Sequence, residues 1–164
     1  MKDIKIAIIV GSASDIPQMA RAEEILKEFA IPYEIKVLSA HRTPEALHAY
    51  VKKAEETGTE VIIAAAGKAA ALPGVVASLV TIPVIGVPIK SSFLDGMDSL
   101  LSIVQMPEGI PVGCMGVSNA ANAALYALEI LSLKDPQLKK QIIAYRKKQA
   151  EAIREFNENK KNIH

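Results

Sequence analysis

The sequence predicts a single α/β domain over residues 1–164, built as a three-layer α/β/α sandwich around a parallel sheet. Short, nearly continuously apolar segments rich in β-branched residues alternate with longer segments whose apolar residues recur every three or four positions. This alternation is typical of strand–helix–strand units, whose parallel strands are covered by helices on both faces. The length of 164 residues also matches the usual size of one domain.

The first strand and helix set the pattern that the rest of the chain repeats. The apolar run 4–10 predicts a strand buried on both faces, and from Ile16 to Phe29 the apolar spacing predicts an amphipathic helix that Asp15 is expected to cap. Thr43 is expected to cap the second helix. The later strands are expected at 33–38, 61–66, 84–87 and 111–115, and the later helices at 44–56, 69–79, 95–104, 119–131 and 136–157.

Composition and charge exclude several classes of protein. Half of the residues are hydrophobic and 23% are charged, which is too apolar for a disordered chain. No apolar run reaches the roughly 18 to 20 residues of a membrane helix, and no signal-peptide pattern opens the chain, so we expect a soluble, cytoplasmic protein without a membrane partner. The net charge is +1 and Trp is absent, so no nucleic-acid partner is expected. The single cysteine, Cys114, suits a reducing compartment.

The segment after the first predicted strand, Gly11–Asp15, has the character of an anion-binding turn. Ligands of parallel sheets bind beyond the carboxyl ends of the strands. Small residues here allow close backbone approach, and the hydroxyl groups precede a helix N-terminus. The alternative is a serine-rich helix cap without a ligand, and Asp15 could be that cap or could accept hydrogen bonds from the hydroxyl groups of a ligand. Neither a dinucleotide-binding fingerprint nor a P-loop is present.

The pair His41 and Arg42 follows the second predicted strand and is the sharpest chemical signal in the chain. A histidine at a strand end can take and give a proton near neutral pH. The adjacent guanidinium offers a planar fork for phosphate or carboxylate. The pair therefore predicts proton transfer on an anionic substrate, with a structural histidine as the alternative. Lys68 and Lys90 follow later strands and could also bind an anion, although surface solvation is the default for Lys90.

Other catalytic patterns are missing. His48 and His164 do not form a metal-ligand spacing with His41, so we expect no metal. The serines near the start lack the pattern of a nucleophile elbow. Cys114 lies within an apolar strand segment, where an inert thiol is expected rather than a nucleophile.

Several motifs together resemble the PurE family, which comprises the phosphoribosylaminoimidazole carboxylases and N5-carboxyaminoimidazole ribonucleotide mutases of purine synthesis. The motifs are G-S-A-S-D near the start, S-A-H-R-T-P after the second strand, the L-P-G turn, and D-S-L-L-S-I-V-Q-M-P-E-G-I-P-V from Asp98. The resemblance spans nearly the whole chain. It implies a flavodoxin-like (Rossmann-like) sheet, no cofactor or metal, and a homo-octamer with sites at subunit junctions. In that assembly the C-terminal helix 136–157 would pack on neighbouring subunits.

The resemblance also implies a reaction. In the mutase branch, N5-carboxyaminoimidazole ribonucleotide loses its carboxyl group as CO2, and C4 of the imidazole captures it. His41 matches the family's catalytic histidine, which shuttles the proton. Ser12, Asp15 and Arg42 match substrate-binding positions; we assign Ser12 and Arg42 to the phosphate and Asp15 to the ribose hydroxyls. The remaining expected substrate-binding residues are Ser39, Gly67, Lys68 and Leu72.

One stretch departs from the mutase pattern. That branch usually reads G-G-A-A-H-L-P-G, whereas this chain reads G-K-A-A-A-L-P-G from Gly67, so a second histidine is missing at Ala71 and a cation stands at Lys68. The branch that uses CO2 directly has a basic and a small residue at these positions, but its Ser-Asn between them is absent here. The carboxyl donor therefore stays open, and Lys68 is expected to hold a carboxylate or a bicarbonate-derived group.

Three functions follow from this mixture of features. The mutase of purine (IMP) biosynthesis is favoured by the segments 39–44 and 105–107. A direct CO2-dependent carboxylase of the same imidazole is the nearest alternative. A non-catalytic nucleotide-binding relative is the third, kept open by the histidine missing at Ala71.

Overall fold

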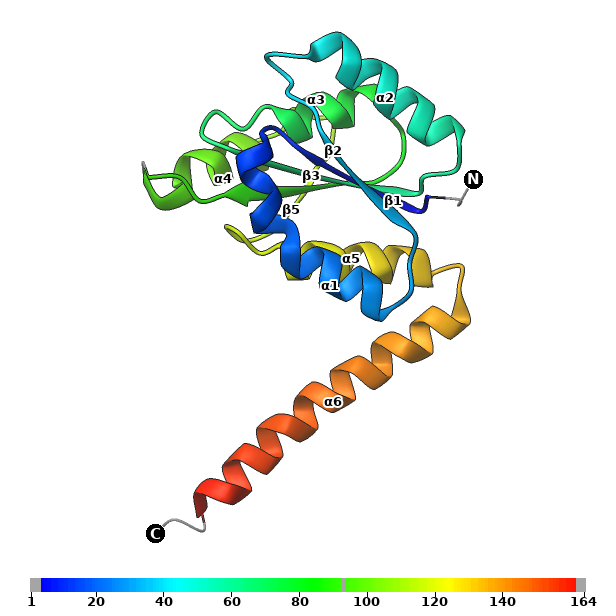
Figure 1. The fold of residues 1–164 in the computed structure, drawn as a ribbon, viewed down its shortest axis with the longest axis vertical. Helices are drawn as coiled ribbons and strands as arrows, with labels where there is room; N and C mark the ends of the chain where they lie inside the picture. The colour runs from blue at the N-terminus through cyan, green and yellow to red at the C-terminus, as the bar shows by residue number, and fades with distance from the viewer. Residues whose placement is uncertain (1–3, 93, 162–164) are drawn as a thin grey trace. The chain divides into compact units, whose positions relative to one another are not determined.

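A five-stranded parallel sheet forms the centre of the structure, with its strands in the order β2-β1-β3-β4-β5. The structure is a computed structural model that describes residues 4–92 and 94–161. This strand order is the flavodoxin-like one, and Figure 1 shows the sheet between helices, so the predicted fold class is confirmed. The strands are β1 (Ile6–Val10), β2 (Tyr33–Val37), β3 (Val61–Gly67), β4 (Val84–Ile89) and β5 (Gly113–Cys114).

The chain falls into two units, and the sheet belongs to the first, which ends at Ala127. In this unit Figure 1 shows α1 and the first part of α5 on one side of the sheet and α2 and α3 on the other, which gives the three layers predicted. The helical segments are η1 (Ala13–Met19), α1 (Ala20–Glu28), α2 (Pro44–Glu56), α3 (Leu72–Leu79), η2 (Leu94–Gly96), α4 (Met97–Val104) and α5 (Ala120–Ser132).

Burial along the strands explains why these segments form the sheet. Every residue of β1 and β4 is buried, because each of these strands has a neighbour on both sides and helices on both faces. In β1, Ala7 and Ile9 belong to a core cluster with Leu47 and Val51 of α2 and Ile103 of α4. Successive side chains of a strand point to opposite faces, so the intervening residues of β1 serve the other layer. The apolar runs seen in the sequence are thus buried from both sides.

The strands at the two edges are less regular. In β2, Lys36 and Val37 are exposed, since this strand pairs with β1 alone. In β5 only Gly113 and Cys114 pair with β4, although a strand over 111–115 was expected. Pro111 has no N–H to donate to a ladder, which shortens the strand at its start.

The starts or caps of several helices differ from the expectations. The helix expected from Ile16 is divided into η1 and α1, and the hydroxyl of Ser12, not Asp15, accepts the cap bond from the Ser14 N–H, at 3.4 Å. Thr43 stands at the N-cap position of α2 but makes no side-chain cap bond. The third helix begins at Leu72 rather than at 69, with a proline in its first turn, where the missing N–H costs nothing.

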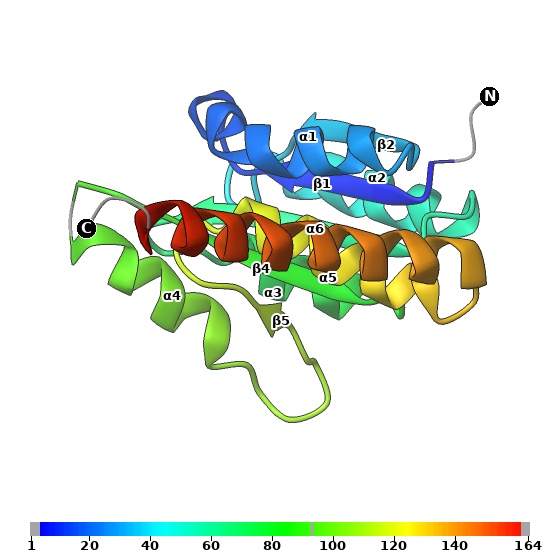
Figure 2. The same ribbon diagram turned by 90° about the horizontal axis from the view of Figure 1, so that it is seen from below.

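The second unit begins at Leu128 and contains α6 (Pro136–Lys161). Asp135 caps this helix by accepting hydrogen bonds from the N–H groups of Gln137 and Leu138, at 2.9 and 3.1 Å. Figure 2 shows α6 as one long, uninterrupted helix, which ends four residues later than expected. In the part of the chain that the structure describes, no helix has the length and apolarity needed to span a membrane.

Candidate active site

A cleft of about 600 Å³ lies in the first unit, at the carboxyl ends of β1, β2, β3 and β4. This is the place where open parallel sheets bind ligands. All eight predicted site residues line it: Ser12, Asp15, Ser39, His41, Arg42, Gly67, Lys68 and Leu72. Of the described residues in the segment after β5, 116–122, none is among the lining residues, although that segment was also considered. The structure thus brings the predicted residues together, while their individual roles stay predictions.

The turn after β1 presents two hydroxyl groups and a carboxylate. The Ser14 hydroxyl lies 2.9 Å from the Ser12 hydroxyl oxygen and 3.4 Å from a carboxylate oxygen of Asp15, so its single proton can go to either. Burial raises the pKa of Asp15 above its usual value, against the opposing effects of the Ser14 hydrogen bond, the Ser12 backbone and the positive charge of Arg42. The carboxylate is therefore held in a partly dry place and benefits from new hydrogen-bond donors.

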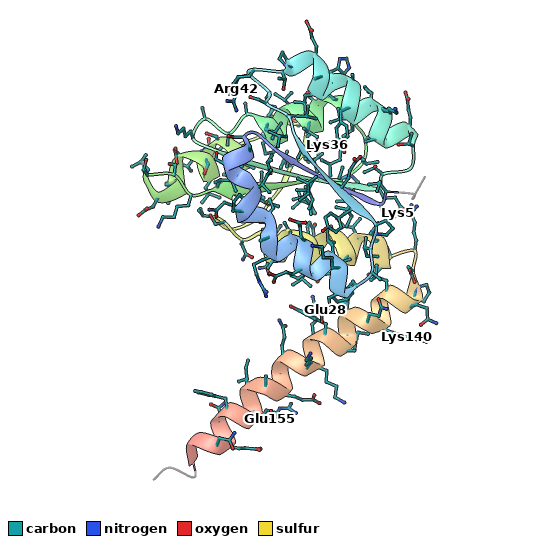
Figure 3. All side chains as sticks on the ribbon, in the orientation of Figure 1. Lys5, Glu28, Lys36, Arg42, Lys140 and Glu155 are labelled. Carbon is teal, nitrogen blue, oxygen red and sulfur yellow. The ribbon has the colours of Figure 1, made fainter. Side chains whose placement is uncertain are left out.

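The turn after β2 is held by its own side chains. Thr43 Oγ1 accepts from the Ser39 N–H at 2.9 Å, and the Ser39 hydroxyl accepts from the Arg42 N–H at 3.2 Å. The Arg42 guanidinium donates to the Gly11 carbonyl oxygen at 2.7 Å and to Ser39 Oγ at 3.4 Å. Arg42 therefore bridges the ends of β2 and β1, and Figure 3 shows it in the turn before α2. These bonds use two of its five N–H donors and leave the others for an anion.

His41 belongs to the same turn after β2, next to Arg42 in the chain. Its side chain is exposed and lines the cleft. Within the described residues, no hydrogen bond to its ring is found, so both ring nitrogens can meet a ligand. A histidine so placed can exchange a proton with a bound substrate.

The turn after β3 carries backbone strain. Lys68 has a φ of +57°, a left-handed conformation that costs a residue other than glycine of the order of 1 kcal/mol. The Lys68 carbonyl accepts from the Ala70 N–H at 2.8 Å, which holds the turn in this shape. Leu72, nearly fully buried, follows as the first residue of α3 and gives the cleft an apolar surface. Gly67 lies against the end of β4, where a β-carbon would come within 3.4 Å of the Ile89 carbonyl oxygen.

The turn after β4 supplies the last wall of the cleft. Ile89, Lys90, Ser91 and Ser92 line it. The ammonium of Lys90 forms an ion pair with the carboxylate of Asp95 at 3.2 Å, and both side chains are exposed. Sequence reasoning singled out this segment but assigned none of its residues to the substrate, because a lysine and two serines are common on any protein surface. The sequence feature that could have identified them as lining residues is their position directly after a buried strand.

The charges that line the cleft favour an anion. Among the described lining residues there are three cations, Arg42, Lys68 and Lys90, against the one carboxylate of Asp15. A concave surface with this excess of positive charge concentrates negatively charged ligands. No group of three or more His, Cys, Asp or Glu residues that could hold a metal ion occurs within the described residues. Outside the cleft, burial raises the pKa of the Cys114 thiol, which agrees with the expected inert cysteine.

The chain matches known proteins along most of its length. The family model described as AIR carboxylase matches residues 5–152. An N5-carboxyaminoimidazole ribonucleotide mutase of Pyrococcus abyssi is 62% identical over 142 residues, which cover 87% of this chain and 82% of the relative. A chloroplastic phosphoribosylaminoimidazole carboxylase of Vigna aconitifolia is 49% identical over 148 residues, 90% of this chain but 27% of that longer protein.

A solved structure agrees with these sequence matches. The crystal structure of Treponema denticola PurE is 32% identical to this chain, superimposes with a TM-score of 0.85, and the match covers 92% of this chain and 94% of that one. The family model, the relatives and the shared fold, together with a cationic cleft at the predicted sheet edge, lead to one conclusion: this chain belongs to the AIR carboxylase (PurE) family.

Proposed function

We propose that this protein is an N5-carboxyaminoimidazole ribonucleotide mutase, an isomerase of de novo purine (IMP) biosynthesis that moves a carboxyl group from N5 to C4. The observation that carries the proposal is the position of His41 beside Arg42 in a cationic cleft. The substrate of a mutase bears a phosphate and a carboxylate, and the three cations that line the cleft suit a ligand with both. The high identity to relatives named as mutases favours this activity over the alternatives.

The phosphate of the substrate is assigned to the half of the cleft formed after β1 and β2. Arg42 is already oriented by Gly11 and Ser39, so it can present its remaining N–H donors without losing much side-chain freedom. Ser12 and Ser39 add hydroxyl donors beside it. Asp15 accepts hydrogen bonds from the ribose hydroxyls, a role that suits a carboxylate whose burial leaves it short of donors.

The imidazole ring is assigned to the apolar part of the cleft, where Gly67 allows close backbone approach and Leu72 offers a buried apolar surface. As the N–CO2 bond breaks, its electron pair stays on nitrogen, and protonated His41 supplies the proton that nitrogen needs. C4 of the ring then attacks CO2 and forms a carbon–carbon bond. Neutral His41 removes the proton left on C4, which restores the aromatic ring and returns the histidine to its starting state.

Lys68 is assigned to the carboxyl group during this transfer. Its ammonium belongs to the lining of the cleft and has no ion-pair partner in the described part of the chain, so a carboxylate can pair with it without competition. The same feature supports the second candidate, a direct CO2-dependent carboxylase, because the cation at Lys68 and the small side chain at Ala71 resemble that branch. A non-catalytic nucleotide-binding protein is the third candidate.

We further propose that residues 1–164 act as one PurE-like domain within a cytoplasmic homo-octamer. Support comes from α6, whose Ile143, Ile153 and Phe156 side chains are each at least 60% exposed in the single chain. Large apolar side chains on a long helix gain stability when another surface covers them. The lone thiol of Cys114 suits a reducing compartment.

Two substrates separate the three candidate functions. Purified protein is given either N5-carboxyaminoimidazole ribonucleotide or aminoimidazole ribonucleotide with CO2, and the C4-carboxylated product is followed. Rapid turnover of the first substrate supports the mutase, because the carboxyl group then comes from the substrate itself. Turnover of the second substrate alone would reject the mutase and support the direct carboxylase. Turnover of neither, with nucleotide still bound, would favour the non-catalytic protein.

The proton-shuttle role of His41 is tested by His41→Asn. We expect turnover to fall by about 10²- to 10⁴-fold, the usual contribution of general acid–base catalysis, while substrate still binds. His48→Asn is the matched control, because His48 is exposed on α2 and is not among the lining residues of the cleft. Near-normal turnover in His41→Asn would remove the shuttle role.

A further inference from the structure

Ser118 holds an unusual backbone conformation close to the cleft wall formed after β4. Its φ is +54°, in the left-handed region that glycine occupies without strain and serine does not. Such conformations persist in a folded protein only where surrounding contacts fix them. The strain therefore points to contacts that Ser118 makes and that another conformation would lose.

These contacts are made to the end of β4 on both sides of Ile89. The Ser118 N–H donates to the Pro88 carbonyl oxygen at 2.8 Å, and the Ser118 hydroxyl oxygen accepts from the Lys90 N–H at 3.2 Å. β5 itself ends at Cys114, and the Met115 N–H still donates to Gly86 at 2.9 Å. Ser118 thus supplies hydrogen bonds to the end of β4 at a point where the neighbouring strand, β5, has already ended.

A second serine holds the same turn from within the core. Ser99 of α4 is fully buried, and its hydroxyl lies 3.0 Å from the Ile89 carbonyl oxygen and 2.8 Å from that of Gly96. The carbonyl of Ile89 and the amide of Lys90 are therefore both tied to side chains of other elements. The turn that places Lys90 in the cleft is fixed at its base, while the Lys90 ammonium pairs with the exposed Asp95.

From these contacts we infer that Ser118 is a positioning residue of the active site. Its hydroxyl fixes the Lys90 backbone, so that Lys90, Ser91 and Ser92 form the wall facing the substrate. Glycine at this position would relieve the strain but would leave the Lys90 N–H without its acceptor. The presence of serine indicates that the hydroxyl matters more than the strain. The importance of this wall for substrate rests on the proposed function.

Three variants separate the hydroxyl from the backbone strain. Ser118→Gly removes both, Ser118→Ala removes the hydroxyl alone, and Ser118→Asn keeps an acceptor oxygen on a residue that tolerates the left-handed conformation. Turnover of N5-carboxyaminoimidazole ribonucleotide gives KM and kcat, and thermal unfolding gives Tm. Ser78→Ala is the control, because the Ser78 hydroxyl bonds to a helix carbonyl, Val75, at 2.7 Å and is not among the lining residues.

The loss of one hydrogen bond predicts that KM rises about 3- to 10-fold in Ser118→Gly and Ser118→Ala, with kcat within about twofold of the parent. Ser118→Asn should lie nearer the parent, and the Tm of Ser118→Gly should not fall below that of Ser118→Ala. A purely structural role would instead make KM follow Tm. Unchanged KM in Ser118→Gly, or a fall in kcat alone, would overturn the inference.

Amide hydrogen exchange in the ligand-free protein keeps this result separate from the proposed function. The Lys90 amide should exchange about 3- to 10-fold faster in Ser118→Gly, while amides of β1 stay unchanged. Unchanged exchange at Lys90 would overturn the inference even if the enzyme is a mutase. Faster exchange in a protein that turns over neither substrate would support the structural part of the inference and reject the proposed function instead.

Discussion

The two halves of the cleft are built differently. In the half formed after β1 and β2, side chains hold the two turns: the Arg42 guanidinium donates to the Gly11 carbonyl and the Ser39 hydroxyl, and the Thr43 hydroxyl accepts from the Ser39 N–H. In the half formed after β3 and β4, strained or clamped backbone carries lysines whose ammonium groups are exposed. The first half presents donors with fixed directions, which suits a phosphate that stays in place. The second presents point charges on flexible stems, which suits a carboxyl group that moves during the reaction.

Replacing the fixed guanidinium should give the largest effect on binding. Arg42→Ala removes a charge-assisted hydrogen-bond donor from the proposed phosphate site and should weaken substrate affinity about 10- to 100-fold, from about 1.5–3 kcal/mol. Arg42→Lys should recover only part of this, because an ammonium cannot bond to Gly11, Ser39 and phosphate in the same fork-like way. The measurement is KM together with calorimetric affinity for the nucleotide.

The control for this change is Arg21→Ala, since Arg21 is exposed on α1 and pairs with Glu24 there. It should leave affinity unchanged. Equal affinities of Arg42→Ala and the parent protein would remove the phosphate assignment and, with it, the proposed difference between the two halves.

Replacing the strained lysine should give a smaller and more selective effect. Lys68→Met removes the charge but keeps a side chain in the left-handed position, and it should weaken binding of the carboxylated nucleotide about 3- to 10-fold, the loss expected for one exposed charge contact. Affinity for the nucleotide without the N5-carboxyl group should hardly change. An equal loss of affinity for both nucleotides would indicate that Lys68 contacts the phosphate instead.

Lys68→Gly completes this test through stability. The Lys68→Gly variant should lose the same selectivity, yet its free energy of unfolding should be equal to that of Lys68→Met or higher by up to about 0.5 kcal/mol, because relief of the φ of +57° offsets the entropy that glycine adds to the unfolded chain. Urea unfolding measures this difference. A glycine variant less stable than Lys68→Met would show that the turn is not strained.

The smallest effect concerns Asp15 and its pH dependence. Burial raises the pKa of Asp15 in the folded protein above its unfolded value, so the folded state binds the proton more tightly. The parent protein should therefore lose stability relative to Asp15→Asn as pH rises from the unfolded pKa through the raised folded pKa, with a constant difference at higher pH. Urea unfolding of both proteins at acidic and neutral pH measures this. The prediction would be contradicted if the stability of the parent relative to Asp15→Asn were greater at neutral pH than at acidic pH.

Sequence reasoning reached the first half of the cleft more completely than the second. The role of a short motif with polar side chains, such as Ser39 to Arg42, can be predicted from the sequence because the chemistry of each side chain follows from its residue type. The positive φ values of Lys68 and Ser118 were not foreseen, because left-handed conformations are normally inferred from glycine, and neither residue is glycine.

The fold was predicted well where burial alone decides it. The apolar runs of β1, β3 and β4 are covered from both sides and lie where expected. The errors fall at ends, where hydrogen bonds compete. Ser12 takes the cap expected of Asp15, and the Thr43 hydroxyl bonds to Ser39 rather than to its own helix. Such choices depend on the local backbone geometry at the helix end, which the spacing of residues along the chain does not contain.

The bond from Arg42 to the Gly11 carbonyl also links the proposed phosphate site to the stability of an edge strand. β2 has one neighbour, β1, and this bond closes the open end of that pair. Any fraying of β2 would therefore displace the hydrogen-bond donors proposed to bind the phosphate. By thermodynamic linkage the converse holds as well: a ligand that binds Arg42 and Ser12 together would stabilise the pairing of β2 with β1 at the edge of the sheet. Slower amide exchange along β2 would then report that the ligand is bound.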